Sequence, residues 1–254
     1  MCIIDSFIDE QSEKFEDSLP SIADDIPALH NVATDLNTVS QGCNLIVYGA
    51  PGTGKSYFLN KYEPNLRTVF HRDYHNSDFI GAYRPFSEGD DIKYLFVPGP
   101  FIKCFISALK NPTSQQNLII EEINRASASA VFGEIFQLLD RDKNGKSIYE
   151  VEPSHVLFNY LDGVLNDTAG WNGKLYMPSN MSILATMNSA DQGVERMDAA
   201  FKRRWTFQYM PIDFEMIDAE DARRSDCISY GSVNLSWCKL AESINSILGA
   251  NGLP

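Results

Sequence analysis

The sequence predicts an α/β fold built on a parallel β-sheet, and two observations favour it. Apolar runs typical of buried strands alternate with segments of helical periodicity, and a glycine-rich loop lies between the first strand and the first helix of this series. Strands that alternate with helices imply a parallel sheet. Ligands of such sheets bind beyond the carboxyl ends of the strands, so we expect a ligand site at that edge.

The glycine-rich loop is the octapeptide at 49–56, GAPGTGKS, which follows the apolar run 45–48 and precedes a helical segment. Strand, loop and helix in this order are the setting of a phosphate-binding P-loop. Its backbone N–H groups turn toward the phosphates, and the helix N-terminus adds positive potential. We expect Lys55 to reach the β- and γ-phosphates and Ser56 to hold Mg²⁺. The predicted nucleotide-binding residues are Gly49, Ala50, Pro51, Gly52, Thr53, Gly54, Lys55, Ser56 and Tyr57.

The elements before residue 117 follow from apolar periodicity and from helix breakers. Residues 1–40 show weak helical patterning and are expected to form a helical lead-in that packs on the core. A strand at 44–48 and a helix at 54–62 come next, and Pro64 ends that helix. Residues 67–71 form a short strand. Residues 72–100 resemble an insertion, with a turn at 88–91 and a strand at 93–97. Residues 101–109 are apolar on a helical period.

The remaining elements continue the alternation. A buried strand at 117–121 runs into acidic residues, and a helix follows at 127–141. Its apolar side chains recur at helical spacing, at Val131, Phe132, Ile135, Leu138 and Leu139. Residues 142–180 are rich in loops. A buried strand at 182–187, a helix at 197–204 and a last strand at 205–210 follow, and Ser236 is expected to cap a helix at 237–248.

Two carboxylates stand at the tip of the strand that ends at residue 121. An apolar strand that delivers Glu121 and Glu122 to its end is expected of an enzyme that hydrolyses nucleoside triphosphates. One carboxylate supports Mg²⁺ and the next polarises the attacking water. We assign Glu121 to the metal and Glu122 to the water. Glu121 stands where many such enzymes have Asp, one methylene shorter.

Asn188 and the run 202–204 complete the candidate site. Asn188 closes an apolar strand and could hydrogen-bond the γ-phosphate or its attacking water; the alternative is an Asn that only forms a turn. Arg203 and Arg204 stand at a helix C-terminus, where the helix dipole favours cations in any case. Their place just before the last strand suits an arginine finger that reaches the phosphate of a neighbouring subunit.

Composition excludes several function classes. The chain has 254 residues, of which 44% are hydrophobic and 22% charged, as in an ordinary soluble domain. Its net charge of −13 argues against a broad surface for bare nucleic acid, so nucleic acid is expected only through another domain or subunit. Five scattered cysteines, and neither a signal peptide nor a membrane-spanning run, predict a cytoplasmic protein without membrane contact.

The motifs resemble those of the McrB-type branch of the AAA+ NTPases, close to the dynein-related AAA group. The resemblance lies in the P-loop and in residues 119–126, 185–191 and 201–205, with further likeness at 70–85 and 131–134. It covers about residues 44–212. It implies a P-loop AAA+ fold with strand order 5-1-4-3-2, a small helical lid and a homo-oligomeric ring, a hexamer. The chain then divides into a lead-in at 1–40, a nucleotide-binding core at 41–212 and a partial helical lid at 213–254.

The same resemblance implies roles for the candidate residues. It makes Glu121 and Glu122 the Walker B acids, Asn188 the first sensor, and Arg203 or Arg204 the finger, with Mg²⁺ as cofactor and ATP or GTP as substrate. Members of this branch are motors of restriction and phage-defence systems, in which the ring drives a separate McrC-like nuclease subunit. Gln192 stands where the best-known members have Arg. We also expect no DNA-reading domain before residue 40 and a shortened lid.

Two other readings of the sequence remain open at this stage. A MoxR-like chaperone ATPase that remodels protein partners would share the fold and most motifs. A nucleotide-binding switch with little turnover would retain the P-loop without a complete lid. A turnover assay separates the switch from both enzymes, and the identity of neighbouring genes separates the two enzymes.

Overall fold

A computed structural model describes residues 41–247, with gaps at 64, 89–90, 190–192, 212–226, 231–232, 237–243 and 245–246. The predicted helical lead-in at 1–40 lies outside the described residues. None of the helices among the described residues has the length and hydropathy of a membrane-spanning segment.

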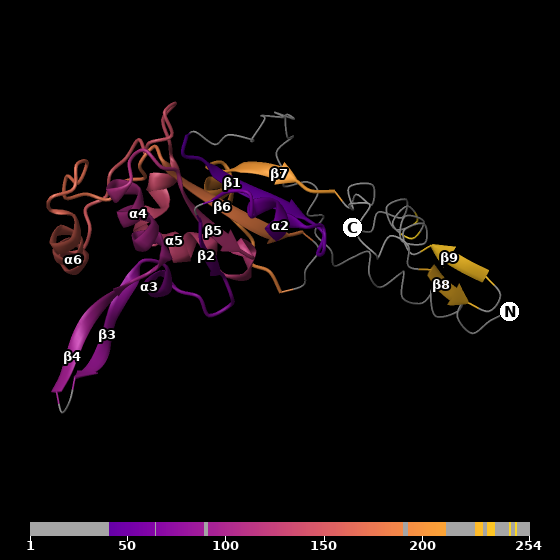
Figure 1. Ribbon diagram of the computed structural model, residues 1–254, viewed down its shortest axis with the longest axis horizontal. Helices are drawn as coiled ribbons and strands as arrows, with labels where there is room; N and C mark the ends of the chain where they lie inside the picture. Colours follow the sequence, from indigo (N-terminus) through magenta and orange to yellow (C-terminus); the bar gives the residue numbers. More distant parts are fainter. Residues whose placement is uncertain are drawn as a thin grey trace. The chain divides into compact units, whose positions relative to one another are not determined.

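Five parallel strands form the main sheet (Figure 1). They are β1 (Asn44–Gly49), β2 (Asn65–Val69), β5 (Gln116–Glu121), β6 (Met181–Asn188) and β7 (Thr206–Tyr209). Their order across the sheet is β2-β5-β6-β1-β7, and every neighbouring pair is parallel. If these five strands are numbered 1 to 5 in chain order, the sheet read from β7 to β2 has the order 5-1-4-3-2. The expected topology is therefore confirmed.

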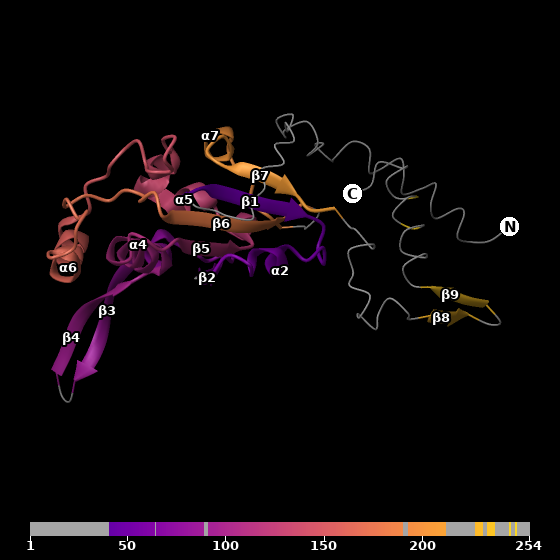
Figure 2. The same cartoon turned by 45° about the horizontal axis from the view of Figure 1, so that its top comes forward.

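Helices lie on either side of this sheet and beyond its end (Figure 2). They are α2 (Lys55–Leu59), α3 (Asn76–Phe79), α4 (Pro100–Lys110), α5 (Ala128–Phe132), α6 (His155–Leu165) and α7 (Ala199–Lys202), with 3₁₀ turns η2 (Ile123–Arg125) and η3 (Gly133–Leu139). The helix predicted at 54–62 is therefore shorter than expected. The central strands β1, β5 and β6 are apolar and buried almost throughout, as expected of parallel strands covered on both faces.

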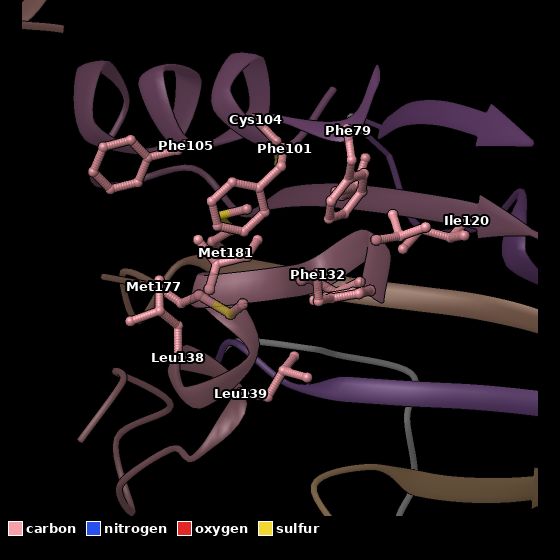
Figure 3. Close-up of a cluster of buried hydrophobic side chains, with 14 of the residues drawn as sticks. Phe79, Phe101, Cys104, Phe105, Ile120, Phe132, Leu138, Leu139, Met177 and Met181 are labelled. Atoms are coloured by element: carbon pink, nitrogen blue, oxygen red, sulfur yellow. The ribbon is translucent and has the colours of Figure 1, made fainter. Parts of the chain in front are cut away.

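Aromatic side chains fill the core between these helices and the sheet. Figure 3 shows Phe101 of α4, Phe79 of α3 and Phe132 of α5 gathered beside Ile120 of β5. The ring centroids of Phe79 and Phe132 lie 4.9 Å apart, and those of Phe79 and Phe101 lie 5.7 Å apart. Offset and tilted pairs at this distance add roughly 0.5–1.5 kcal/mol each beyond their buried area. Contacts between residues far apart in sequence therefore tie the helices to the strand that ends in the acidic pair.

The helix predicted at 127–141 is broken at Gly133. The α-helical part ends at Phe132 and the chain continues as a 3₁₀ turn. Gly133 has φ of 51° and ψ of −126°, a conformation that L residues rarely adopt. The side chain of Asn76 crosses this point, since its Nδ2 donates to the carbonyl of Val131 at 2.8 Å. The predicted apolar stripe is nonetheless buried, from Val131 to Leu139.

Two further elements differ from the sequence-based prediction. The region 142–180 contains α6, which was predicted as loop. Ser154 caps this helix by accepting from Leu157 N, and buried leucines recur along one face at Leu157, Leu161 and Leu165. The predicted insertion at 72–100 contains an antiparallel hairpin of β3 (Gly81–Glu88) and β4 (Asp91–Pro98), which extends away from the sheet in Figures 1 and 2. The strand predicted at 93–97 lies inside β4. Of the turn predicted at 88–91, residues 89–90 lie outside the described residues.

The region predicted as a partial helical lid contains a two-stranded antiparallel hairpin that was not predicted. Its strands are β8 (Cys227–Tyr230) and β9 (Val233–Ser236). Ser236 therefore ends a strand. The helix predicted at 237–248 lies mostly outside the described residues, although Ile244 and Ile247 are helical.

Asn44 joins three segments at the start of β1. Its Nδ2 donates to the carbonyls of Leu139, at 2.8 Å, and Arg204, at 3.0 Å, while its Oδ1 accepts from Nε of Arg141 at 2.8 Å. Asn44 is buried, and burial lowers the pKa of Arg141 to about 10, so the guanidinium stays charged at neutral pH. Both the N–H₂ group and the oxygen of the Asn44 amide are thus used. They connect the start of β1 to the end of η3 and to the residue pair that precedes β7.

Replacing Asn44 by Leu should therefore destabilise the fold. The substitution keeps the volume but leaves two carbonyls and one guanidinium nitrogen without this partner. We expect a loss of about 3 kcal/mol or more in the free energy of unfolding. Urea unfolding followed by circular dichroism measures it, with Asn159→Leu on the exposed side of α6 as control, expected to change by less than about 0.5 kcal/mol. Equal unfolding midpoints for the two variants would contradict this role of Asn44.

Candidate active site

Three segments end together at the carboxyl edge of the sheet. β1 ends at Gly49, β5 at Glu121 and β6 at Asn188, and these strands are neighbours. Gly49 stands opposite Asn188 in the β1–β6 register, and Ser189 N donates to the carbonyl of Gly49 at 3.2 Å. The structure therefore brings the start of the P-loop, the acidic pair and Asn188 to one place, where ligands of parallel sheets bind.

The P-loop joins β1 to α2. Gly54 adopts a left-handed conformation, with φ of 82°, immediately before the helix. Gly49 has no room for a side chain, because an added Cβ would lie 2.3 Å from the carbonyl oxygen of Met210 after β7. Both glycines are thus required, one by backbone conformation and the other by the close approach of a neighbouring strand.

Lys55 lies inside this loop. It is only 6% exposed, and its Nζ donates to the carbonyls of Gly49, at 3.1 Å, and Ala50, at 2.6 Å. Thr53 Oγ1 also donates to Ala50 O, at 3.1 Å. The ammonium group is therefore held at the centre of the loop curve, where a phosphate would meet it. Tyr57, also predicted to bind nucleotide, lies on α2 with its side chain largely exposed.

Glu121 is held by hydrogen-bond donors from three elements. Its Oε2 accepts from Ser56 Oγ of α2 at 2.8 Å and from Thr186 Oγ1 of β6 at 2.5 Å. Its Oε1 pairs with Arg67 of β2, which also bonds the side chain of Asn60. The two residues predicted to hold a metal, Ser56 and Glu121, are thus in direct contact.

Glu122 has an unusual backbone. It is the one non-glycine residue with positive φ among the described residues, at φ of 56° and ψ of 48°. Its N–H donates to Thr186 Oγ1 at 3.1 Å, and its Oε1 accepts from Nδ2 of Asn188 at 2.5 Å. Its Oε2 lies 3.6 Å from Nε of Arg125 and accepts no hydrogen bond from the described residues. This oxygen keeps lone pairs that could receive a proton.

Asn124 of η2 connects the segment after the acidic pair to the end of β6. It is buried, and its Nδ2 donates to the carbonyl of Asn188 at 3.0 Å. Its own carbonyl accepts from Glu195 N at 2.8 Å. Asn124 thereby ties η2 to the end of β6 and to the segment that leads into α7.

The two candidate finger residues have different surroundings. Arg204 is engaged inside the subunit: its Nε and Nη2 bond Asp140 at 2.9 and 2.8 Å, and its guanidinium lies 4.1 Å from the centre of the Phe136 ring. Arg203 is exposed at the end of α7. The geometry leaves Arg203 as the residue of the two that can reach another molecule.

The donor set suits Mg²⁺. A hydroxyl and a carboxylate oxygen are the hard ligands that this ion prefers, and it is commonly bound by one or two protein oxygens together with phosphates and water. Among the described residues, no group of three His, Cys, Asp or Glu side chains could hold a metal by itself. Ser56 and Glu121 therefore fit an ion that arrives with a phosphate ligand.

Sequence reasoning missed Arg67, Thr186 and Asn124. Arg67 and Thr186 lie on strands flanking β5, and their side chains reach the acidic pair across the sheet. Asn124 lies two residues beyond the pair. The available signal was positional: Thr186 precedes Asn188 by two residues, so both side chains point to the same face of β6.

The match to known protein families agrees with this geometry. Residues 44–205 match the family described as AAA domain (dynein-related subfamily), which is more than half of the chain. The chain belongs to this family. The matched region begins at β1 and ends just before β7, so it contains the P-loop, the acidic pair and Asn188.

The chain is similar in sequence to components of two restriction enzymes. The chain is 43% identical over 203 residues to the type II restriction enzyme BsuMI component YdiS of Bacillus subtilis, a match that covers 67% of this chain and 57% of that protein. It is 32% identical over 198 residues to the type IV methyl-directed restriction enzyme EcoKMcrB subunit of Escherichia coli, covering 72% of this chain and 38% of that protein. The resemblance to McrB-type AAA+ proteins is thereby confirmed. The match spans less than two thirds of the length of either relative.

The contrast between the two arginines predicts different effects on stability. Arg204→Met should lower the free energy of unfolding by about 2–3 kcal/mol, because Asp140 loses a charged hydrogen-bond partner. Arg203→Met should change it by less than about 0.5 kcal/mol, since the side chain is exposed. Urea unfolding of both variants and the parent measures this difference. If Arg203→Met were the more destabilising variant, the assignment of Arg204 to the fold would be wrong.

Proposed function

We propose that this chain binds and hydrolyses nucleoside triphosphates, ATP or GTP, together with Mg²⁺. One observation carries the proposal. The carboxylate of Glu122 is held by Asn188 beside a P-loop whose buried Lys55 faces the loop centre. The match to the AAA domain family and the similarity to a restriction-enzyme subunit support it. A phosphate-binding loop alone would suit many nucleotide-binding proteins, whereas an oriented carboxylate at its mouth suits attack by water.

Each residue has a proposed role. Lys55 and the loop N–H groups bind the β- and γ-phosphates, and Ser56 and Glu121 hold Mg²⁺. Mg²⁺, when bound, neutralises charge on the β- and γ-phosphate oxygens. Glu122 orients the attacking water and takes its proton on Oε2, the oxygen that Asn188 does not use. Asn188 fixes the carboxylate of Glu122 through Nδ2 and is proposed to bind the attacking water or the γ-phosphate.

We further propose that Arg203 acts as an arginine finger on a neighbouring subunit. It precedes β7, at one edge of the sheet, while Glu121 ends β5, three strands away in the order. A side chain so placed does not readily reach the γ-phosphate of its own subunit. Head-to-tail contacts that repeat and close produce a ring, and we propose a hexamer.

For the biological role, we propose an NTP-driven motor of a McrBC-like restriction or phage-defence system, acting with a separate McrC-like nuclease subunit. Both relatives are named as parts of restriction enzymes, which supports this role over that of a protein-remodelling chaperone. The net charge of −13 is unfavourable for direct binding to DNA phosphates. Contact with nucleic acid is therefore assigned to another domain or subunit.

The test is turnover of ATP and GTP by the purified protein, with and without EDTA and with the candidate nuclease subunit. Phosphate release that requires Mg²⁺ is the expected result. Absence of turnover with either nucleotide, with nucleotide binding retained, would favour a nucleotide-binding switch instead.

Two substitutions separate binding from chemistry. Glu122→Gln should keep nucleotide affinity and lower the turnover number by about 10²-fold or more, because an amide cannot take the proton of water. Lys55→Ala should weaken binding itself by roughly 1.5–3 kcal/mol, through loss of a charge-assisted contact. Fluorescent-nucleotide titration and phosphate release measure the two effects. Normal turnover in Glu122→Gln, with loss in Glu121→Gln, would reverse the two proposed roles.

A mixture of inactive variants tests the finger. Arg203→Ala lacks the finger and Glu122→Gln lacks the base, but a co-assembled ring would contain sites in which an intact Arg203 faces an intact Glu122. Activity of the mixture should therefore exceed that of either variant alone, and activity per subunit of the parent should rise with protein concentration. A mixture that co-assembles without any gain would refute action across subunits.

A further inference from the structure

Thr186 occupies a position between the two acidic residues. It lies on β6 two residues before Asn188, so both side chains project from the same face of the strand. Thr186 is 3% exposed, and Val47, its register partner on β1, is fully buried. Burying a hydroxyl without a hydrogen-bond partner costs free energy, so the hydroxyl of Thr186 is expected to bond other protein groups.

The hydroxyl is used in both directions. Its hydrogen is donated to Oε2 of Glu121 at 2.5 Å, and its oxygen accepts the N–H of Glu122 at 3.1 Å. One hydroxyl has a single donor and two acceptor lone pairs, so this pattern fills the donor and leaves one lone pair. A single side-chain oxygen therefore links the carboxylate of Glu121 to the backbone of Glu122.

This link lies where β5 and β6 stop pairing with each other. The β5–β6 ladder has its last register pair at Ile120 and Ala185, and Glu122 then turns into a left-handed conformation. Such a conformation costs roughly 1–3 kcal/mol and needs support from its surroundings. The N–H of Glu122 has no strand partner in this ladder, and Thr186 supplies one. The same strand holds the other end of Glu122, through Asn188.

We propose that Thr186 is a positioning residue, which sets the relative placement of the metal-binding and the base carboxylate. The inference rests on the proposed hydrolysis of nucleoside triphosphates. Thr186 does not touch the substrate. It acts by holding Glu121 toward Ser56 and by fixing the backbone from which the Glu122 side chain reaches the water.

The competing explanation is that Thr186 only fills space in a β-strand. Thr and Val have nearly the same shape, and both favour strands. A role in packing alone would therefore be served equally by Val, whereas a role through the hydroxyl would be served by Ser and not by Val. These two substitutions distinguish the explanations.

The experiment compares Thr186→Val and Thr186→Ser with the parent chain, and uses Thr68→Val as a matched control. Thr68 lies on β2, is partly buried, and its hydroxyl bonds the phenol of Tyr74 at 3.0 Å. The control thus removes an equivalent hydroxyl outside the acidic pair. Turnover at saturating nucleotide, KM, the Mg²⁺ concentration for half-maximal nucleotide binding, and the thermal midpoint are measured for each.

Thr186→Val should lower kcat by about tenfold or more while KM changes by less than about threefold, since small displacements of catalytic groups act on the reaction step. It should also raise the Mg²⁺ concentration for half-maximal nucleotide binding, because Glu121 is less well held. Thr186→Ser should recover kcat to within about threefold of the parent, and Thr68→Val should resemble the parent. Equal loss in Thr186→Ser and Thr186→Val, or unchanged kcat and Mg²⁺ dependence in Thr186→Val, would overturn the proposal.

Two provisions keep the test decisive. If Thr186→Val fails to fold, Thr186→Cys replaces the hydroxyl by a weak thiol donor. Its kcat should lie between the kcat of the parent and the kcat expected for Thr186→Val. A kcat equal to that of the parent would overturn the proposal. If the parent itself shows no turnover, the proposed function fails, and the Mg²⁺ dependence of nucleotide binding then tests Thr186 by itself.

Discussion

The parallel pairing of β6 with β1 on one side and β5 on the other is the constraint on which the site depends. This strand stands between the P-loop strand and the acidic strand, in register with both. Because parallel strands in register end at one edge, the loop, the two carboxylates and Asn188 meet without any long excursion of the chain. A slip of one residue between β5 and β6 would turn Thr186 and Asn188 to the opposite face and separate them from the acids.

The predictable part of this structure is local or periodic. The glycine-rich loop, the ends of β5 and β6 and the alternation of strands and helices can be read from short stretches, and the strand order followed from the family resemblance. The failures have long-range causes. The α-helix ends at Phe132, where Asn76, 55 positions earlier in the chain, donates to the carbonyl of Val131. The leucines of α6 recur at helical spacing inside a region dominated by glycines and polar residues.

The same limit applies to the site. The residue types at strand ends indicated Glu121, Glu122 and Asn188. The local sequence could not show which of the two arginines, Arg203 or Arg204, bonds to its own subunit. Arg204 pairs with Asp140, 64 positions earlier in the sequence, and that pairing is visible only when α7 and η3 are placed together. The dipole of α7 favours both cations equally, so only tertiary contacts separate an arginine that stabilises the subunit from one that faces outward.

The different surroundings of the two carboxylates bear on their proposed roles. Glu121 receives donors from Ser56, Thr186 and Arg67, which offset the cost of placing a second negative charge beside it and fix both of its oxygens. Glu122 receives one amide hydrogen bond on Oε1, while Oε2 accepts no hydrogen bond from the described residues and lies 3.6 Å from Nε of Arg125. A metal ligand benefits from fixed oxygens, whereas a base needs an oxygen with an available lone pair. The extra methylene of Glu at position 121, where an Asp is common, is accommodated because three donors restrain the longer side chain.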